Sequence, residues 1–324
     1  MNIVVVVPGG LTEALQAAPL LATLPTATDE PLMVACAAAT APVVGRLDGV
    51  DEILAVPGLG RHPGPLALGR LWAALRSRRL DVAIVCSRSA AVHLAVHLAA
   101  APRRIGCAGR LSSAFLTDRV ECAGDGNVAR SWEGLGGAVG ASHAPAPGGY
   151  RSTDAATADA ERLVLSNGIV DGRLLVAIAP GFGFAEGAVS TWSAERCAHL
   201  ANRLASRHGA GIVLVGDDRD REVADAMRID LAADTLDLCG EADLATTAAV
   251  LKRCDLLVGA DTPLLHLAAA VGTSSVGLFG PTDGRVRAPA GGEHRVVQAL
   301  PNGRAASLDH IRVDDVLAGI ESTL

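Results

Sequence analysis

The chain has 324 residues, half of them hydrophobic, and a formal net charge of −7 at pH 7. This length exceeds what one hydrophobic core usually serves and favours two domains. The acidic balance argues against a nucleic-acid partner, which would need a basic surface to displace counterions. No apolar run has the length of a transmembrane segment and the first residues do not resemble a signal peptide, so we expect a cytoplasmic protein, with peripheral membrane contact left open.

The first half alternates short apolar runs with helical patterns. We predict strands at residues 3–7, 31–37, 52–56, 81–86 and 103–107, and helices at 13–24, 41–47, 66–78, 90–100 and 127–139. Short connections between alternating strands and helices favour a parallel, doubly wound sheet. Residues 140–152, rich in Gly, Pro and Ser, predict an interdomain linker that divides the chain into domains 1–148 and 149–324.

The second half repeats this plan. We predict strands at 174–179, 210–216, 235–239, 254–260 and 275–280, and helices at 153–166, 194–207, 219–231, 244–253, 263–271 and 313–321. The last helix is a candidate to pack back on the N-terminal domain. The predicted fold class is therefore α/β, with two Rossmann-like doubly wound parallel-sheet domains whose carboxyl edges face a cleft.

Cysteines and acidic residues give no metal-site pattern. Seven cysteines are scattered, mostly in apolar segments, and none forms a Cys-x-x-Cys pair, which predicts buried free thiols. The acidic run 217–220 suggests an Asp-x-Asp metal motif, but four charges before an amphipathic helix are more simply a solvated helix start. We therefore expect no metal site.

Three glycines follow the predicted strand 174–179 and suggest a dinucleotide fingerprint. Gly181, Gly183 and Gly187 are spaced one residue too far for G-x-G-x-x-G, and helical sequence resumes only after Trp192. The third glycine cannot then pack at the start of a helix, as that motif requires. We therefore expect no NAD site.

Three polar residues lie where the apolar helix 263–271 begins. Asp261, Thr262 and His266 follow a strand, which places them at the carboxyl edge of a parallel sheet, the edge at which such proteins bind ligands. A helix N-terminus favours anions, and His266 can donate to a phosphate oxygen. The alternative is an ordinary helix cap, with Pro263 just inside the helix and a buried histidine one turn later.

A second polar group follows the first strand. Gly9 and Gly10 predict a tight turn where backbone can approach a ligand, and Glu13 lies near the start of the next helix. The alternative for Glu13 is an acidic residue that the helix dipole stabilises, with Thr12 as the cap.

The run GADTPLLHLAAAVGTSSVGLFGPTDGRVRAP, residues 259–289, resembles the C-terminal signature of glycosyltransferase family 9, the lipopolysaccharide heptosyltransferase family. The specific part is Asp-Thr, the His four residues later, and Phe-Gly-Pro-Thr. Weaker similarity extends to VVVPGGLTEALQAAPLLATL, LDVAIVCSRSA, RRIGCAGR and APGFGFAEGAVSTWSAERCAHLANRL. The resemblance therefore covers nearly the whole chain.

The resemblance implies a GT-B type fold and metal-independent, inverting transfer of a sugar, typically heptose from ADP-heptose, to an acceptor hydroxyl. The nucleoside-diphosphate sugar is a substrate, so no cofactor is implied. The C-terminal domain would bind this donor through Asp261, Thr262, His266, Thr191, Ser190, Glu222 and Gly181. Glu222 would reach the ribose; its alternative is a charge on an exposed helix.

The N-terminal domain would serve the acceptor, which is a glycan, a lipid-linked molecule or a small molecule. The family has an Asp as base where this chain has Glu13, and a carboxylate there would take the proton of the acceptor hydroxyl. Gly9, Gly10, Thr12 and Arg61 would form the acceptor-side loop. The alternative for the arginines of this domain is ordinary surface charge, and an acceptor other than lipopolysaccharide stays open.

Two positions depart from the family pattern at the donor site. Ser190 replaces a Lys that neutralises the leaving diphosphate, and Pro263 replaces a Gly whose N–H would face the phosphate. The developing charge would then need Thr191, Thr262, His266 or an arginine from elsewhere in the chain. These departures keep open the alternative of a catalytically impaired nucleotide-sugar binding protein. A nucleotide-sugar epimerase of the same fold is a further alternative, but the additional acidic and basic residues expected in its cleft are not found.

Overall fold

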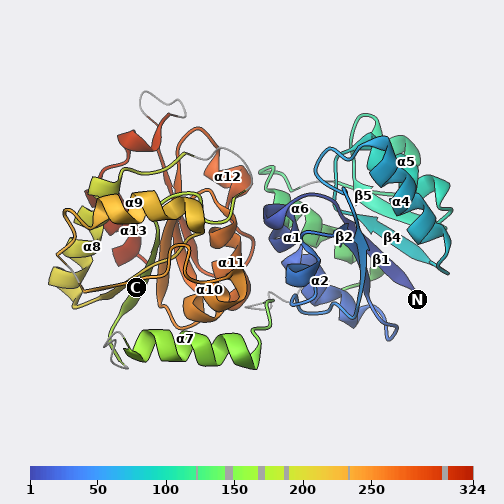
Figure 1. Ribbon diagram of the computed structural model, residues 1–324. Coiled ribbons are helices and arrows are strands. Elements are labelled where there is room, and N and C mark those ends of the chain that lie inside the picture. Colours follow the sequence, from blue (N-terminus) through green and yellow to red (C-terminus); the bar gives the residue numbers. More distant parts are fainter. Residues whose placement is uncertain are drawn as a thin grey trace. The chain divides into compact units, whose positions relative to one another are not determined.

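The computed structural model describes residues 1–121, 123–142, 149–166, 172–185, 190–232, 234–300 and 306–323. The chain forms two compact units, Met1–Gly149 and Tyr150–Leu324 (Figure 1). The predicted boundary between residues 148 and 149 lies one residue from this division, and linker residues 143–148 fall outside the described ranges. The predicted cleft between the units stays a prediction.

The first unit contains a six-stranded, parallel sheet in the order β3-β2-β1-β4-β5-β6. Its strands are β1 (Ile3–Val7), β2 (Met33–Ala37), β3 (Glu52–Val56), β4 (Val82–Val85), β5 (Arg103–Cys107) and β6 (Asp118–Val120). All five residues of β1 are buried, which is why this central strand is a continuous apolar run. β6 was not predicted, because two of its three residues are charged.

The helices of the first unit are α1 (Leu11–Gln16), α2 (Ala18–Thr23), α3 (Ala41–Val44), α4 (Pro65–Arg76), α5 (Ala90–Leu98) and α6 (Val128–Glu133). The prediction of one helix over 13–24 was wrong, because Pro19 lacks the N–H that a continuous helix needs and instead lies in the first turn of α2. The predicted helix 127–139 is α6 followed by a 3-10 helix, Gly134–Val139, whose glycines disfavour an α-helix.

The second unit has the same topology, with a parallel sheet in the order β12-β11-β10-β7-β8-β9. Its strands are β7 (Leu175–Ala179), β8 (Gly211–Leu214), β9 (Thr235–Asp237), β10 (Leu256–Ala260), β11 (Ser274–Phe279) and β12 (His294–Gln298). The strand order reverses between β7 and β10, as it does between β1 and β4, and such switch points are where doubly wound sheets bind ligands. The edge strand β12 was not predicted.

The helices of the second unit are α7 (Asp154–Ser166), α8 (Ala194–His208), α9 (Arg221–Met227), α10 (Leu244–Leu251), α11 (Pro263–Val271), α12 (Gly284–Arg287) and α13 (Val313–Glu321). Side chains of α8, α9 and α13 form one apolar core with the sheet. The helices α7 and α11 pack with α10 (Figure 1). α13 packs against β11, β12 and α8 of its own unit. Its expected contact with the first unit stays a prediction.

Six cysteines are free and buried among the described residues: Cys36, Cys86, Cys107, Cys197, Cys239 and Cys254. Burial raises the pKa of Cys36 to about 11 and that of Cys197 to about 12. The prediction of buried free thiols is confirmed for these six, and Cys122 lies outside the described residues. In the same ranges, no helix is long and apolar enough to cross a membrane, and no three His, Cys, Asp or Glu side chains gather as metal ligands.

Candidate active site

Two loops meet at the switch point of the second unit, one after β7 and one after β10. The first contains Gly181 and Gly183, and the second contains Asp261 and Thr262. Gly183 has a positive φ of 52°, and a Cβ on it would lie 2.7 Å from Thr262 Oγ1. Only glycine therefore permits this approach, which brings the backbone of the first loop against the start of α11.

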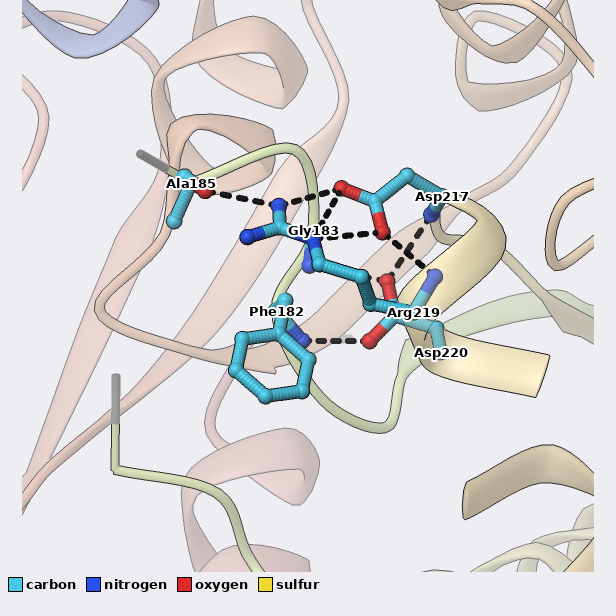
Figure 2. A network of polar contacts seen from close by, with 6 residues as sticks. All are labelled: Phe182, Gly183, Ala185, Asp217, Arg219 and Asp220. Carbon is cyan, nitrogen blue, oxygen red and sulfur yellow. Dashed lines mark hydrogen bonds and ion pairs between the residues drawn. The ribbon is translucent and has the colours of Figure 1, made fainter. Parts of the chain in front are cut away.

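A buried carboxylate holds the first loop in place (Figure 2). Asp220 is fully buried, and its Oδ2 accepts hydrogen bonds from the backbone N–H groups of Gly183 at 3.0 Å and Asp217 at 2.8 Å. Its Oδ1 accepts a hydrogen bond from the N–H of Phe182. Burial raises the pKa of Asp220 above its ordinary value, while these three N–H groups oppose the shift.

The prediction that residues 217–220 are simply a solvated helix start is wrong at Asp220. Asp218 and Arg219 are exposed, but Asp220 turns inward, between two glycines that leave room for it. A Cβ on either Gly181 or Gly216 would lie 2.3 Å from an oxygen of its carboxylate. These glycines, each following a strand, are the signal in the sequence that could have located the buried acid.

Arg219 closes the same network over the loop (Figure 2). It forms an ion pair with Asp217 and donates from Nη2 to the carbonyl of Ala185 at 2.7 Å. Its guanidinium also lies 4.9 Å from the centre of the Phe182 ring, within range of a cation–π interaction. The loop after β7 is thus fixed by one buried and one exposed charged group from the turn after β8.

Asp261, at the end of β10, forms an ion pair with Arg287 at the end of α12. Arg287 Nε donates to Asp261 Oδ2 at 2.5 Å. The Asp261 side chain is 10% exposed and that of Arg287 31%, so the pair is only partly screened by water. From the sequence we expected that an arginine from another part of the chain could serve this site, but the sequence did not identify it as Arg287.

Thr262 is the N-cap residue of α11, yet its side chain makes no capping hydrogen bond. Its Oγ1 is buried and has no hydrogen-bond partner in the described part of the chain. Pro263 follows at the first helical position, so this helix start also offers one N–H fewer. An ordinary side-chain cap therefore does not describe Thr262, and its orphaned hydroxyl lies where a ligand of the helix start would bind.

His266 lies one turn into α11 and is buried, with 3% of its surface exposed. Burial lowers its pKa to about 3, and the positive charge of Arg287 and nearby His294 add to the shift. At neutral pH it is therefore an uncharged imidazole that has one N–H to donate. A bound anion would oppose this shift and favour the protonated form.

The other predicted donor residues occupy different environments. Gly181 is buried against Asp220, whereas Ser190 and Thr191 are half-buried. Glu222 is exposed on α9. The structure therefore brings Gly181, Asp261, Thr262 and His266 together around β7 and β10, while exposure of Glu222 agrees with the alternative of a surface charge.

In the first unit, the turn after β1 holds Glu13 on α1. Glu13 Oε2 accepts a hydrogen bond from the N–H of Gly10 at 3.0 Å, and Oε1 accepts one from Arg61 Nε at 2.8 Å. A Cβ on Gly9, whose φ is 126°, would lie 2.7 Å from Glu13 Cγ. The glycine turn therefore makes room for the carboxylate. Thr12 is half-buried and makes no side-chain cap, since Gly10 is the N-cap residue.

The Glu13 carboxylate is oriented but not saturated. Each carboxylate oxygen can accept two hydrogen bonds. Arg61 donates to Oε1 from both Nε and Nη2, whereas among the described residues Oε2 accepts only from the N–H of Gly10, so the remaining capacity lies on Oε2. The Glu13 side chain is 14% exposed and that of Arg61 59%, so water and a ligand can reach the arginine. The geometry suits a base that is fixed in direction and still able to accept a proton.

Two Rossmann-type units with polar loops at the switch points of their sheets define an α/β protein of the nucleotide-binding class. The chain belongs to glycosyltransferase family 9 (heptosyltransferase), whose family model matches residues 68–312. It is accordingly a glycosyltransferase. The matched range contains the loops after β7 and β10 but not Glu13.

Known proteins resemble this chain over most of its length. Lipopolysaccharide heptosyltransferase 2 of Salmonella typhimurium is 26% identical over 281 residues, 80% of this chain and 76% of that protein. The glycosyl transferase family 9 structure from Veillonella parvula has a TM-score of 0.81 at 20% identity, covering 99% of this chain and 96% of that one. E. coli heptosyltransferase WaaC, solved with ADP-2-deoxy-2-fluoro heptose, has a TM-score of 0.73 at 20% identity, with 100% of both chains covered. These matches confirm the predicted GT-B type fold.

Proposed function

We propose that this glycosyltransferase moves heptose from ADP-heptose to an acceptor hydroxyl with inversion at the anomeric carbon. The observation that carries the donor assignment is the start of α11, where Thr262 Oγ1 is buried and has no hydrogen-bond partner among the described residues. Asp261, whose carboxylate is 10% exposed, directly precedes it. The dipole of α11 favours an anion there. Two similar proteins support this donor: lipopolysaccharide heptosyltransferase 2 of Salmonella typhimurium, and E. coli heptosyltransferase WaaC, which was solved with ADP-2-deoxy-2-fluoro heptose.

In the proposed step, the acceptor oxygen bonds to the anomeric carbon as the bond from that carbon to the diphosphate oxygen breaks. Glu13 takes the acceptor's proton, and the electron pair of the broken bond leaves on ADP. Asp261, Thr262 and His266 hold the donor, and Gly181, Ser190 and Thr191, which lie between β7 and α8, complete the proposed donor site. A ribose contact for Glu222 belongs to this proposal as well, but the exposure of its side chain gives it the weakest support.

The acceptor side of the proposal uses the turn after β1. Gly9 and Gly10 let the backbone approach the acceptor, and Arg61 pairs with the base. The acceptor is a glycan, a lipid-linked molecule or a small molecule. A cytoplasmic location, peripheral contact with a membrane, and a reaction without metal or cofactor are parts of the same proposal.

The test combines donor binding with turnover. The purified protein is titrated calorimetrically with ADP, UDP and GDP, and release of ADP from ADP-heptose is then followed with candidate acceptors. We expect selective binding of ADP, its loss in Asp261→Ala, and its retention in Asp159→Ala, a control in an exposed ion pair with Arg162 on α7.

Glu13→Gln should keep ADP affinity while turnover falls at least about 100-fold, the usual contribution of a general base. Glu52→Gln is the matched control. Glu52 also pairs with an arginine, Arg78, but it is the first residue of β3 and so lies at the amino end of the sheet, whereas Glu13 follows the carboxyl end of β1. Selective UDP binding would overturn the ADP assignment. Full turnover in Glu13→Gln would overturn the base, and absence of turnover in the parent with every acceptor would favour a binding protein. Family membership does not favour that alternative or the epimerase.

A further inference from the structure

The start of α11 offers few donors to an anionic ligand, because Pro263 at its first position has no N–H. An arginine does reach this helix start: Arg287, at the end of α12, is bound to Asp261. Building on the ADP-heptose donor proposed above, we propose that Arg287 binds the diphosphate of the donor and supplies the positive charge that the leaving group requires.

The hydrogen bonds of Arg287 leave its outer nitrogens available. Nε donates to Asp261, and the Nη1 and Nη2 groups have no hydrogen-bond partner among the residues that the structure describes. A guanidinium presents five N–H donors in one plane, so a single side chain can bond a carboxylate through Nε and a phosphate through its outer N–H groups. The 31% exposure of the side chain leaves it accessible to a ligand.

The negative charge of Asp261 also requires a cation at this site if a diphosphate is to bind there. Without Arg287, the Asp261 carboxylate would stand alone at the helix start and repel a diphosphate. His266 cannot supply the missing positive charge, because burial and the charge of Arg287 lower its pKa to about 3 and its ring is therefore neutral. The ion pair therefore offsets the negative charge of Asp261, and Asp261 in turn orients Arg287. The outer N–H groups of Arg287 and the positive end of the α11 dipole can then attract the ligand together.

The loop that leads into α12, the helix that carries Arg287, is held by hydrogen bonds to one side chain of β12. Gln298 Nε2 donates to the carbonyls of Phe279, Gly280 and Thr282, each at 3.0 Å, and Oε1 accepts from the N–H of Gly284 at 2.9 Å. Because the Gln298 side chain fixes both ends of this loop, it also fixes the position at which α12 begins. Arg287 is therefore presented to Asp261 from a preorganised support, which reduces the entropy lost on binding a ligand.

A purely structural role for Arg287, as the partner that Asp261 needs for folding, predicts a different response to ligands. Such a role would affect binding of every part of the nucleotide equally. A bond to the diphosphate affects ADP but not adenosine, which lacks phosphate. The comparison of these two probes in one variant therefore separates the roles.

The experiment is calorimetric titration of Arg287→Ala with ADP and adenosine, together with thermal melting. The matched control is Arg285→Ala, because Arg285 lies on the same short helix, is 82% exposed and pairs with Asp283. We expect ADP to bind roughly 10- to 100-fold more weakly to Arg287→Ala, the range for loss of a hydrogen bond to a charged group. Adenosine affinity should be unchanged, and Arg285→Ala should match the parent for both.

Arg287→Gln guards against a folding defect, since its amide can still donate to Asp261 but carries no charge, and it should also lose ADP affinity selectively. Unchanged ADP affinity in both variants, or an equal loss for ADP and adenosine, would overturn the role of Arg287 and leave the proposed donor intact. A parent protein that binds adenosine but gains nothing from the diphosphate of ADP would overturn both proposals. The increase in ADP dissociation constant should shrink at high salt.

Discussion

Replacement of Asp220 by Asn tests whether the buried carboxylate maintains the loop after β7. The carboxylate accepts three backbone N–H groups, one on Oδ1 and two on Oδ2. The Asn amide can accept on only one side. With its oxygen toward Gly183 and Asp217, the NH2 group faces the N–H of Phe182, and the opposite orientation leaves two N–H groups without an acceptor.

The better orientation of Asn thus orphans one buried donor, which costs about 1–3 kcal/mol in the free energy of unfolding. Burial raises the pKa of Asp220, which means that the charged carboxylate is itself costly to bury, and its removal offsets part of this loss. We expect a net destabilisation of roughly 1–2 kcal/mol. We also expect weaker ADP binding, because the loop contacts Thr262 through Gly183.

Urea unfolding of Asp220→Asn measures this cost in the second unit when Trp72 and Trp132 of the first unit are replaced by Phe, so that the fluorescence comes from Trp192 alone. Asp218→Asn is the control, since Asp218 is an exposed acid of the same turn. If Asp220→Asn unfolds at the same urea concentration as the control and binds ADP equally well, the carboxylate does not hold the loop and the reasoning fails.

Two further predictions concern His266 and Gly9. Since burial lowers the pKa of His266 from 6.5 to about 3, the unfolded chain takes up a proton first, and stability present above pH 6.5 is lost as the pH falls toward 3. Between pH 7.5 and pH 5 this loss is about 2 kcal/mol, and chemical unfolding at both pH values should show it in the parent but not in His266→Gln. Gly9→Ala should displace Glu13, because its Cβ would lie 2.7 Å from Glu13 Cγ, and lower kcat roughly 10- to 100-fold with unchanged ADP affinity. Gly69→Ala, which adds a Cβ with no atom within 4 Å, is the control; if both glycine variants keep full turnover, the Gly9 turn does not position the base.

Sequence patterns located the elements that carry strong local signals. The bounds of α11 were predicted correctly, because Pro263 marks its first residue and Gly272, with a φ of 87°, ends it. The edge strand β12 was missed, since only two of its five residues, Val296 and Val297, are apolar. A strand at a sheet edge needs less apolar sequence than a central one, and its pairing with β11 depends on residues distant in the chain.

Polar networks at the site were less accessible to sequence reasoning. Asp220 binds a loop 38 residues away, and Arg287 binds Asp261 across 26 residues. Neither separation leaves a periodic pattern, and both depend on which strand ends the fold brings together. Family resemblance pointed to Asp261, Thr262 and His266. Only the structure shows that Thr262 Oγ1 is buried and finds no hydrogen-bond partner within the described ranges.

The six cysteines in the described ranges are poor targets for thiol reagents in the native protein. A thiolate is the reactive species, and burial both blocks access and raises the pKa, as it does for Cys36 and Cys197. The described thiols divide evenly, three in each unit. In a Cys122→Ser variant, alkylation followed by peptide mass spectrometry would report how often each unit opens and exposes its thiols. Local opening of the unit with the donor site can then be distinguished from opening of the unit with Glu13, without adding any probe to the chain.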